Sequence, residues 1–327
     1  MPLAAGTSPR LKVAIARALP PPVIAQLAAS HEVWVNPDAR TLTPDELQAA
    51  AVGVDVLIVT ALNRLDAAAI ARLPAGLRII ATYSVGIEHI DLDAARSRGI
   101  AVLSTPDVLS DAVAEMAILL MLGAARRAHE ATSLLYTGGW SGWTPTQLVG
   151  IEVTGRRIGI AGMGRIGRTI ARRARGFDMP VHYHNRSRLA ADLEEDATYH
   201  DSIDGLMAVS DVLVLAAPST PATRGMVDRS RIAAMPPDAI VVNIARGDLV
   251  DDTALIEALQ SGRVASAGLD VFNNEPRLDP RYLTLPNVFL QPHQGSSTLT
   301  ARLKMGQILL QGIAAVVAGK PAVNRLV

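Results

Sequence analysis

The glycine pattern Gly162-Met163-Gly164-Arg165-Ile166-Gly167 constrains the fold of this chain more than any other feature. It follows the apolar run Ile158 to Ala161, which we expect to be a strand, and precedes Arg168 to Arg175, which we expect to be helical. In that setting the first glycine permits a tight turn, the second lets the backbone approach a pyrophosphate, and the third lets the helix pack on the strand. The helix N-terminus adds partial positive charge. The pattern therefore predicts a dinucleotide-binding βαβ unit, with a nicotinamide cofactor as its ligand.

A basic turn, Asn185-Arg186-Ser187-Arg188, ends the next expected strand, Val181 to His184. A chain that binds NAD usually has an acidic residue here, which hydrogen-bonds to the ribose hydroxyls. An aspartate at position 185 would repel a 2′-phosphate at roughly 4 Å by about 4 kcal/mol if the effective dielectric constant is ~20. Asparagine removes that repulsion and Arg186 adds attraction. We interpret the turn as a 2′-phosphate pocket that favours NADP(H) over NAD(H); the alternative is a solvated basic turn that does not discriminate.

The composition excludes several classes of protein. The 31 basic residues balance 31 acidic ones, so no net field would hold the chain on nucleic acid or on an anionic membrane. An aromatic content of 3% argues against a base-stacking surface. The 327 residues, 49% of them hydrophobic, suffice for two compact domains. Cysteine is absent, which excludes disulfides and thiol catalysis and agrees with a cytoplasmic protein.

No segment resembles a membrane or export signal. Met1 to Arg17 interrupts its apolar residues with prolines and basic residues, so it lacks the continuous apolar core of a secretory signal. The longest apolar stretch, Met116 to Ala125, is half the ~20 residues needed to cross a bilayer. We therefore expect a soluble protein that acts on small molecules, with no membrane or nucleic-acid partner.

Two series of short apolar runs alternate with helical patterns, which predicts two parallel, doubly wound sheets. The first series has expected strands at Leu11 to Ala16, Glu32 to Val35, Val54 to Thr60, Leu77 to Thr82 and Ile100 to Leu103, with helices such as Pro22 to Ala29 and Asp66 to Arg72. The second series has expected strands at Ile158 to Ala161, Val181 to His184, Val212 to Ala216, Ala239 to Ile244, Ser266 to Val271 and Val288 to Gln291.

The breaks between the series suggest a discontinuous domain. Thr105-Pro106 ends the first series, and a long helix is expected from Asp111 to Arg127, with Ser110 as its cap. A final helix, Thr298 to Ala318, is expected to cross back and pack on the first domain. The predicted fold is α/β: a Rossmann cofactor domain, residues 105–296, inserted into a flavodoxin-like substrate-binding domain, residues 1–104 and 297–327.

Three loops of the second domain leave strand ends, where function gathers in open α/β sheets, and each carries one reactive side chain. Arg246 could grip a carboxylate with two parallel hydrogen bonds, although alone it reads as a surface arginine. Glu275 could orient an imidazole and stabilise its charged form, or be an ordinary loop acid. His293 is the best candidate acid, because imidazole titrates near working pH, although a lone histidine is more often structural.

No metal site is expected. His182 and His184 share one strand face, but the sequence offers no third ligand of suitable spacing.

With these residues in order, the chain resembles the D-isomer-specific 2-hydroxyacid dehydrogenase family over nearly its full length. The resemblance rests on ordered blocks: Tyr83 to Asp91, the long helix with Ala114-Glu115, the glycine pattern, Asn243 to Asp248, Gly268 to Phe272 through Glu275-Pro276, and Pro292 to Ser296. It implies that Arg246, Glu275 and His293 form a catalytic triad. Hydride would pass from the nicotinamide to the 2-keto carbon while protonated His293 donates to the carbonyl oxygen, and Arg246 with the backbone near Val85 and Gly86 would hold the substrate carboxylate.

The resemblance also implies a set of cofactor-binding residues. Asp270 would contact the nicotinamide carboxamide, and Pro218 to Pro221 would line the adenosine side. The full expected set is Gly162, Gly164, Arg165, Ile166, Gly167, Asn185, Arg186, Ser187, Arg188, Pro218, Thr223, Ala245, Asp270, His293 and Gly295.

Within the family the chain resembles NADP-using glyoxylate/hydroxypyruvate reductases, chiefly through Asn185 to Arg188. Such an enzyme would make glycolate or D-glycerate. Departures at Gln294, Ala301 and Gln311-Gly312 leave the substrate open: a larger or branched 2-keto acid, 2-ketogluconate or 3-phosphohydroxypyruvate are alternatives, and a dinucleotide-sensing, corepressor-like protein is another. Trp140 and Trp143 lie where related reductases reach across a dimer, so we expect a homodimer through the cofactor domain, in which they complete the partner's pocket or serve apolar burial alone.

Overall fold

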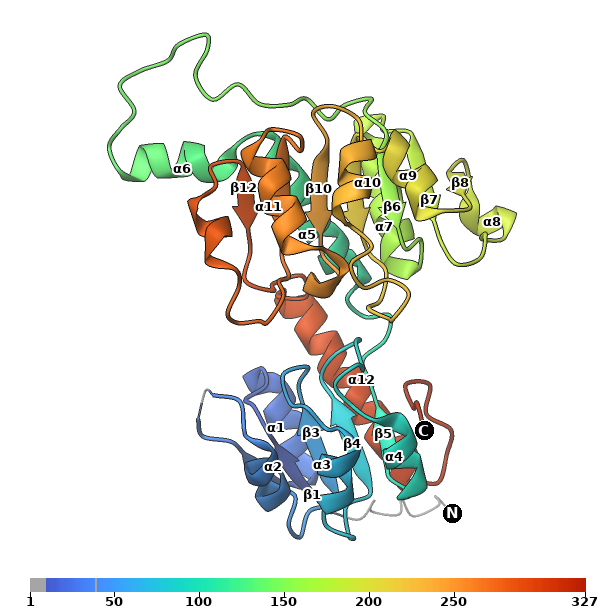
Figure 1. Cartoon of the computed structure of the whole chain (residues 1–327). Coiled ribbons are helices and arrows are strands. Elements are labelled where there is room, and N and C mark those ends of the chain that lie inside the picture. Colours follow the sequence, from blue (N-terminus) through green and yellow to red (C-terminus); the bar gives the residue numbers. More distant parts are fainter. Residues whose placement is uncertain (1–9, 39) are drawn as a thin grey trace, which may run out of the picture. The chain divides into compact units, whose positions relative to one another are not determined.

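The computed structural model describes residues 10–38 and 40–327 (Figure 1). The chain divides into two compact units, which we number 1 and 2: unit 1 ends at Leu109 and resumes with Thr298–Val327, and unit 2 is Ser110–Ser297. The expectation about a secretory signal in Met1 to Arg17 falls mostly on residues 1–9, which lie outside the described residues. The bounds of the units differ by a few residues from the domain bounds expected from the sequence, since Thr105 to Leu109 fall in unit 1 and Ser297 falls in unit 2. The Thr105 N–H donates to the Ser84 carbonyl, in unit 1, at 3.0 Å.

Unit 1 contains a parallel five-stranded sheet of order β2-β1-β3-β4-β5, which is the flavodoxin-like order. Its strands are β1 (Lys12–Ile15), β2 (Glu32–Val35), β3 (Val56–Val59), β4 (Ile79–Thr82) and β5 (Ala101–Leu103). Its helices are α1 (Pro21–Ser30), α2 (Pro44–Ala50), α3 (Ala67–Arg72), α4 (Leu92–Ser97) and α12 (Leu299–Val317). Every residue of β3 and β4 is buried, as expected for strands covered by helices on both faces.

The last helix and the C-terminal residues are tied into unit 1. Helix α12 packs on α1, β4 and β5. Asn324, which is 2% exposed, donates from Nδ2 to the carbonyl of Ser104 at 2.9 Å and to that of Ile308 at 3.2 Å. The residues that follow unit 2 in the sequence therefore complete the core of the unit that precedes it.

Unit 2 contains a parallel seven-stranded sheet of order β12-β11-β10-β9-β6-β7-β8. Its strands are β6 (Ile158–Ala161), β7 (Val181–His184), β8 (Thr198–His200), β9 (Val212–Leu215), β10 (Ile240–Asn243), β11 (Ser266–Leu269) and β12 (Val288–Leu290). Its helices are α5 (Ser110–Ala125), α6 (Ala128–Tyr136), α7 (Arg165–Ala174), α8 (Ala191–Glu194), α9 (Ile203–Val209), α10 (Arg229–Ala234) and α11 (Asp252–Gln260), with short 3₁₀ turns η1 (Arg175–Phe177), η2 (Gly247–Leu249) and η3 (Pro280–Thr284). The order is that of a Rossmann domain with one added strand, and the predicted fold class is confirmed.

The long helix and the edge strand of unit 2 differ from the sequence prediction. The long helix ends at Ala125 and not at Arg127, because Arg127 adopts a left-handed conformation with φ 52°, after which α6 begins. Strand β8 was not predicted, since it is only three residues long and polar, and forms by pairing with β7 at the edge of the sheet. Among the described residues, no helix is both long and apolar enough to span a bilayer.

Candidate active site

The three side chains singled out in the sequence follow three neighbouring strands. Arg246 comes after β10, Glu275 after β11 and His293 after β12, and these strands lie side by side and parallel in unit 2. The carboxyl ends of parallel strands meet at one edge of a sheet. The fold therefore brings Arg246, Glu275 and His293 to the same edge.

His293 and Glu275 form a hydrogen-bonded pair. His293 Nδ1 lies 2.6 Å from Glu275 Oε2, and the Phe272 N–H donates to Glu275 Oε1 at 2.9 Å. Burial by itself would raise the pKa of Glu275, but the hydrogen bond and charge of His293, the Phe272 N–H and the charge of Arg246 together lower it. An ionised carboxylate can only accept, so the proton of the pair sits on Nδ1. This leaves Nε2 as the ring atom for exchange with a substrate.

Asp270 fixes the backbone of the loop that carries His293. Asp270 is 1% exposed, and its two carboxylate oxygens accept the N–H groups of Gln294 at 2.6 Å and Gly295 at 2.7 Å. Its carbonyl accepts the His293 N–H at 2.8 Å, and His293 itself has a left-handed φ of 54°. Burial raises the pKa of Asp270, and the two N–H groups partly offset that shift. Sequence reasoning gave Asp270 only a cofactor contact and missed this anchoring role, because spacing does not reveal the direction of backbone N–H groups.

The loop of Arg246 is held against the loop of Glu275. Asn243 donates to the Arg246 carbonyl at 2.8 Å and accepts the Ala245 N–H at 3.0 Å, and an Arg246 guanidinium nitrogen donates to the Ala245 carbonyl at 2.6 Å. A Cβ on Gly247 would overlap the backbone of Phe272 and Asn273. This close approach requires glycine, and it explains why the charge of Arg246 reaches Glu275.

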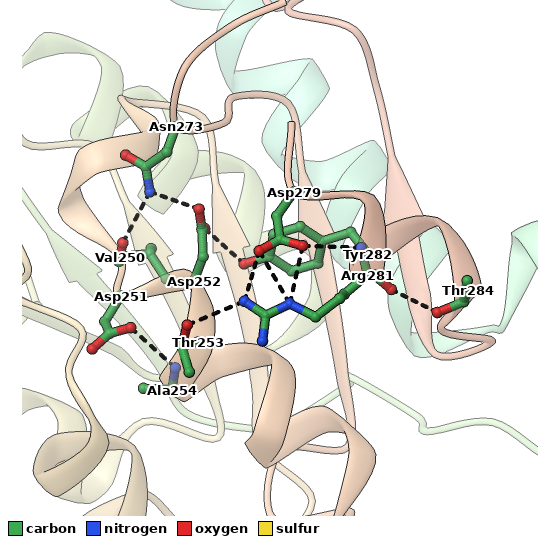
Figure 2. A network of polar contacts seen from close by, with 10 residues as sticks. All are labelled: Val250, Asp251, Asp252, Thr253, Ala254, Asn273, Asp279, Arg281, Tyr282 and Thr284. Atoms are coloured by element: carbon green, nitrogen blue, oxygen red, sulfur yellow. Dashed lines mark hydrogen bonds and ion pairs between the residues drawn. The ribbon is translucent and has the colours of Figure 1, made fainter. Parts of the chain in front are cut away.

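A polar network fastens the segment that carries Glu275 to the start of α11 (Figure 2). Asn273 donates from Nδ2 to the Val250 carbonyl at 3.3 Å and to Asp252 at 2.9 Å. The buried Tyr282 donates from its hydroxyl to the other oxygen of Asp252, also at 2.9 Å. One carboxylate of α11 thus holds both ends of the segment 273–282, which reduces the freedom of Glu275 between them.

The glycine pattern forms a tight turn between β6 and α7. Gly162 has a φ of 102°, and a Cβ there would lie 2.5 Å from the Ala217 nitrogen. A Cβ on Gly167 would overlap the Gly162 carbonyl oxygen, whereas one on Gly164 would meet no atom of the described residues within 4 Å. The turn and the helix packing therefore require glycine at 162 and 167, and the space beside Gly164 is open to a ligand. Arg165 and Ile166 form the first turn of α7.

The structure gives the residues of the basic turn different surroundings. Asn185 accepts the Met163 N–H at 2.6 Å and so closes the glycine turn. Arg186 and Ser187 are exposed. Arg188 instead directs its Nε to Glu194, at 3.0 and 3.1 Å from the two oxygens, and its guanidinium lies 5.9 Å from the centre of the Tyr199 ring. Glu194 is 6% exposed, and the sequence gave no sign of this partner.

The Pro218 segment is linked to the loop of Arg246. Thr223 donates from Oγ1 to the Pro218 carbonyl at 2.7 Å, which closes a turn. Ser219 donates from Oγ to Asp248 at 2.6 Å, two residues beyond Arg246. Asp248 thus connects the segment expected on the adenosine side to the loop that carries Arg246.

The remaining residues of interest lie elsewhere. Val85 and Gly86 belong to unit 1, in the turn after β4, where Val85 is 40% exposed. Trp140 and Trp143, in the segment after α6, are 54% and 79% exposed. His182 Nδ1 lies 3.0 Å from His200 Nε2, and the described part of the chain contains no group of three or more metal-ligating side chains.

Together, a dinucleotide turn and an imidazole–carboxylate pair on one edge of a Rossmann sheet define a dinucleotide-dependent oxidoreductase. Comparison with known proteins gives the family. Residues 118–295 match the family described as D-isomer specific 2-hydroxyacid dehydrogenase, NAD binding domain. The chain is 43% identical over 296 residues to a glycerate dehydrogenase of Hyphomicrobium methylovorum, covering 90% of this chain and 92% of the relative. It is 41% identical over 310 residues to a glyoxylate reductase of Thermococcus kodakarensis, covering 94% and 93%.

Solved structures agree. A crystal structure from a Polaromonas species, itself ascribed to this family, has a TM-score of 0.94 at 51% identity and covers 98% of this chain and 100% of that one. An NADPH-dependent glyoxylate/hydroxypyruvate reductase of Sinorhizobium meliloti has a TM-score of 0.84 at 32% identity, with 97% of each chain covered. The chain belongs to the D-isomer-specific 2-hydroxyacid dehydrogenase family, and unit 2 contains its NAD(P)-binding domain.

Proposed function

We propose that the protein reduces small 2-keto acids, such as glyoxylate and hydroxypyruvate, to the D-2-hydroxy acids glycolate and D-glycerate, with NADPH as the preferred cofactor. The observation that carries the proposal is the pair of His293 and Glu275, joined at 2.6 Å on the sheet edge that also holds Arg246 and the glycine turn. The relatives named glyoxylate reductase and glycerate dehydrogenase support the same substrate class.

Each residue of the triad has one role in this proposal. Arg246 binds the substrate carboxylate through its guanidinium and draws electron density from the neighbouring carbonyl. His293 donates the proton on Nε2 to the carbonyl oxygen as that oxygen becomes negatively charged. Glu275 accepts from Nδ1, which keeps the ring oriented and favours its protonated form. In unit 1, Val85 and Gly86 would offer their backbone N–H groups to a substrate carboxylate.

The residues present fit a dinucleotide. When bound, the reduced nicotinamide supplies the hydride that the keto carbon receives. The turn from Gly162 to Gly167 with the start of α7 would hold the pyrophosphate, since the space beside Gly164 is open. Pro218 and Thr223 would line the adenosine side, and Ala245, Asp270, His293 and Gly295 the nicotinamide side.

The preference for NADPH rests on the turn after β7. Asn185 stands where an acid would repel a 2′-phosphate, and Arg186 is exposed there with no hydrogen bond or ion pair to any described residue. Arg188 is also exposed, and Glu194 holds its Nε, so its terminal nitrogens would meet a phosphate from a fixed position. The relative of Sinorhizobium meliloti, which is named as NADPH-dependent, supports this choice.

We also propose that the chain acts as a homodimer in the cytoplasm. In unit 2, the segment from α6 to residue 149 exposes several large apolar side chains. Exposed apolar surface of this kind commonly marks a site of protein–protein interaction. The side chains are Leu135, Tyr136, Trp140, Trp143 and Val149, all at least 54% exposed. Burial against a second copy would remove this surface from water.

Steady-state kinetics on the purified protein tests the proposal. The expected result is a higher kcat/KM with NADPH than with NADH on glyoxylate and hydroxypyruvate. Equal or better efficiency with NADH would contradict the cofactor preference. A panel that adds 2-ketogluconate, 3-phosphohydroxypyruvate and a branched 2-keto acid tests the substrate class. Tight cofactor binding without reduction of any of these acids would contradict an enzymatic role.

A further inference from the structure

A chain of three hydrogen bonds in unit 1 ends on the carbonyl of Gly86. His89 Nε2 lies 2.9 Å from Thr82 Oγ1, and Thr82 Oγ1 lies 2.6 Å from Ser84 Oγ. Ser84 Oγ donates to the Gly86 carbonyl at 2.7 Å. Thr82 is the last residue of β4 and is fully buried, so its hydroxyl depends on these protein partners. We name this series, His89 to Thr82 to Ser84 to Gly86, the hydroxyl chain.

The protons of the hydroxyl chain have one possible arrangement. A carbonyl oxygen only accepts, so Ser84 uses its single hydroxyl proton on Gly86. Ser84 must then accept from Thr82, which uses its own proton in that bond. Thr82 therefore accepts from His89, and Nε2 of His89 carries a proton. Each hydrogen bond of the hydroxyl chain is therefore donated in the same direction, from the His89 imidazole toward the backbone of the turn.

The same turn has a second anchor. The Ser84 carbonyl accepts the Thr105 N–H at 3.0 Å, and in a trans peptide the Val85 N–H points the opposite way from that carbonyl. The hydroxyl chain fixes the carbonyl of the Gly86–Ile87 peptide, so the Val85–Gly86 peptide, which carries the Gly86 N–H, lies between two anchored peptides. Among residues 10–38 and 40–327, no acceptor receives the N–H of Val85 or of Gly86. Two adjacent N–H groups without an acceptor in the described part of the chain, one in an anchored peptide and one between two anchored peptides, form an anion-binding arrangement.

We propose that His89 is a positioning residue for substrate binding. Through Thr82 and Ser84 it holds the turn from Ser84 to Gly86, so that the N–H groups of Val85 and Gly86 are directed at the substrate carboxylate. The inference rests on the proposed function, in which these groups bind the acid. It adds a residue that touches neither substrate nor cofactor and acts only through two hydroxyls.

Three variants test the proposal by separating KM from kcat. Thr82→Val keeps the shape of the side chain and removes the hydroxyl, His89→Leu removes the donor, and His89→Gln keeps an N–H donor on a side chain of similar reach. For Thr82→Val and His89→Leu we expect the KM for glyoxylate and the inhibition constant of oxamate to rise by about 3- to 10-fold, as for the loss of one hydrogen bond. The kcat and the KM for NADPH should stay within twofold of wild type. His89→Gln should restore most of the loss.

A matched control is His31→Leu, because His31 is in the same unit and its Nδ1 has no partner among the described residues. Its kinetic constants should equal those of wild type. If Thr82→Val fails to fold, the two variants of the partly exposed His89 still decide the question. Unchanged KM in His89→Leu, or equal impairment in His89→Gln, would overturn the inference while leaving the proposed function in place. Wild-type protein that neither reduces glyoxylate nor binds oxamate would overturn both.

Discussion

Glu275 and His293 meet through Oε2 and Nδ1, 2.6 Å apart, although 18 residues separate them in the sequence. The pair exists because β11 and β12 are neighbours in the sheet. In addition, the Phe272 N–H holds the Glu275 carboxylate, and the buried Asp270 holds the loop that carries His293. This contact between Glu275 and His293 orients the imidazole ring of His293. In the proposed reaction, the other ring nitrogen, Nε2, donates the proton.

Replacing His293 by asparagine should lower kcat by about 10²- to 10⁴-fold, the usual loss when a positioned acid is removed. The fold should persist, because the loop is held by the backbone N–H groups of Gln294 and Gly295 and not by the ring. Stopped-flow measurement of NADPH oxidation checks the rate, and circular dichroism checks the fold. An unchanged kcat would remove His293 from the mechanism, and His31→Asn serves as the control.

Glu275→Gln should change the pH dependence of reduction. The folded-state pKa of Glu275 lies below its ordinary value, so the carboxylate is ionised at neutral pH and loses its charge only as the pH falls through that lowered pKa. Glutamine cannot ionise, so the fall in kcat/KM on the acid side that accompanies protonation of Glu275 should be absent from the variant. Loss of the charge should also lower kcat by about 10-fold or more, since proton transfer slows. Identical pH profiles for the two proteins would contradict the role of Glu275.

Asn185→Asp should reverse the preference between cofactors. Aspartate keeps an oxygen for the Met163 N–H, so the glycine turn should stay intact while a negative charge is added. The ratio of kcat/KM for NADPH to that for NADH should fall by about 10- to 100-fold, because like charges some 4 Å apart repel strongly. Steady-state assays with both cofactors measure the ratio.

Arg186→Ala is the companion variant. Arg186 is exposed and makes no hydrogen bond or ion pair within the described part of the chain, so its loss should not disturb the fold. The KM for NADPH should rise while that for NADH stays nearly constant. If both variants leave the ratio unchanged, the turn is a solvated one that does not discriminate.

Gly247→Ala should destabilise unit 2 by about 1–3 kcal/mol, the usual cost of forcing an extra carbon into a packed site. The added carbon would push the loop of Arg246 away from the backbone of Phe272 and Asn273, so kcat/KM should fall as well. Gly176→Ala is the control, because a Cβ at Gly176 meets no atom within 4 Å in the part of the chain that the structure describes and its φ is not positive. Urea unfolding measures both, and equal midpoints for the two variants would contradict the predicted overlap.

His182 should make the protein less stable in mild acid. Burial lowers the pKa of His182, and the charges of His200 and Arg157 add to that shift. Because the folded-state pKa lies below 6.5, stability present above pH 6.5 is lost as the pH falls through the folded-state pKa. His182→Val should therefore lose less stability than wild type between pH 7 and pH 5. Thermal unfolding at both pH values measures the difference, and parallel losses would refute the prediction.

Sequence reasoning reached the fold class because hydrophobic runs and the glycine turn determine parallel βαβ units locally. It did not find β8, whose three residues form a strand only by pairing with β7. It also missed Glu194 beside Arg188 and the N–H groups that Asp270 accepts. Such contacts depend on side-chain directions and on loops brought together by the sheet, and neither leaves a periodic signal in the chain.

The residues proposed to bind and reduce the substrate are divided between the two units, and this division affects how such enzymes can evolve. Arg246, Glu275 and His293 all come from unit 2, whereas the turn of Val85 and Gly86 comes from unit 1. Genetic recombination near residues 109 and 298 would exchange the turn of Val85 and Gly86 and transmit Arg246, Glu275 and His293 together. Descendants of such a chain can therefore change their preference among acids through unit 1, while the three side chains of unit 2 are kept.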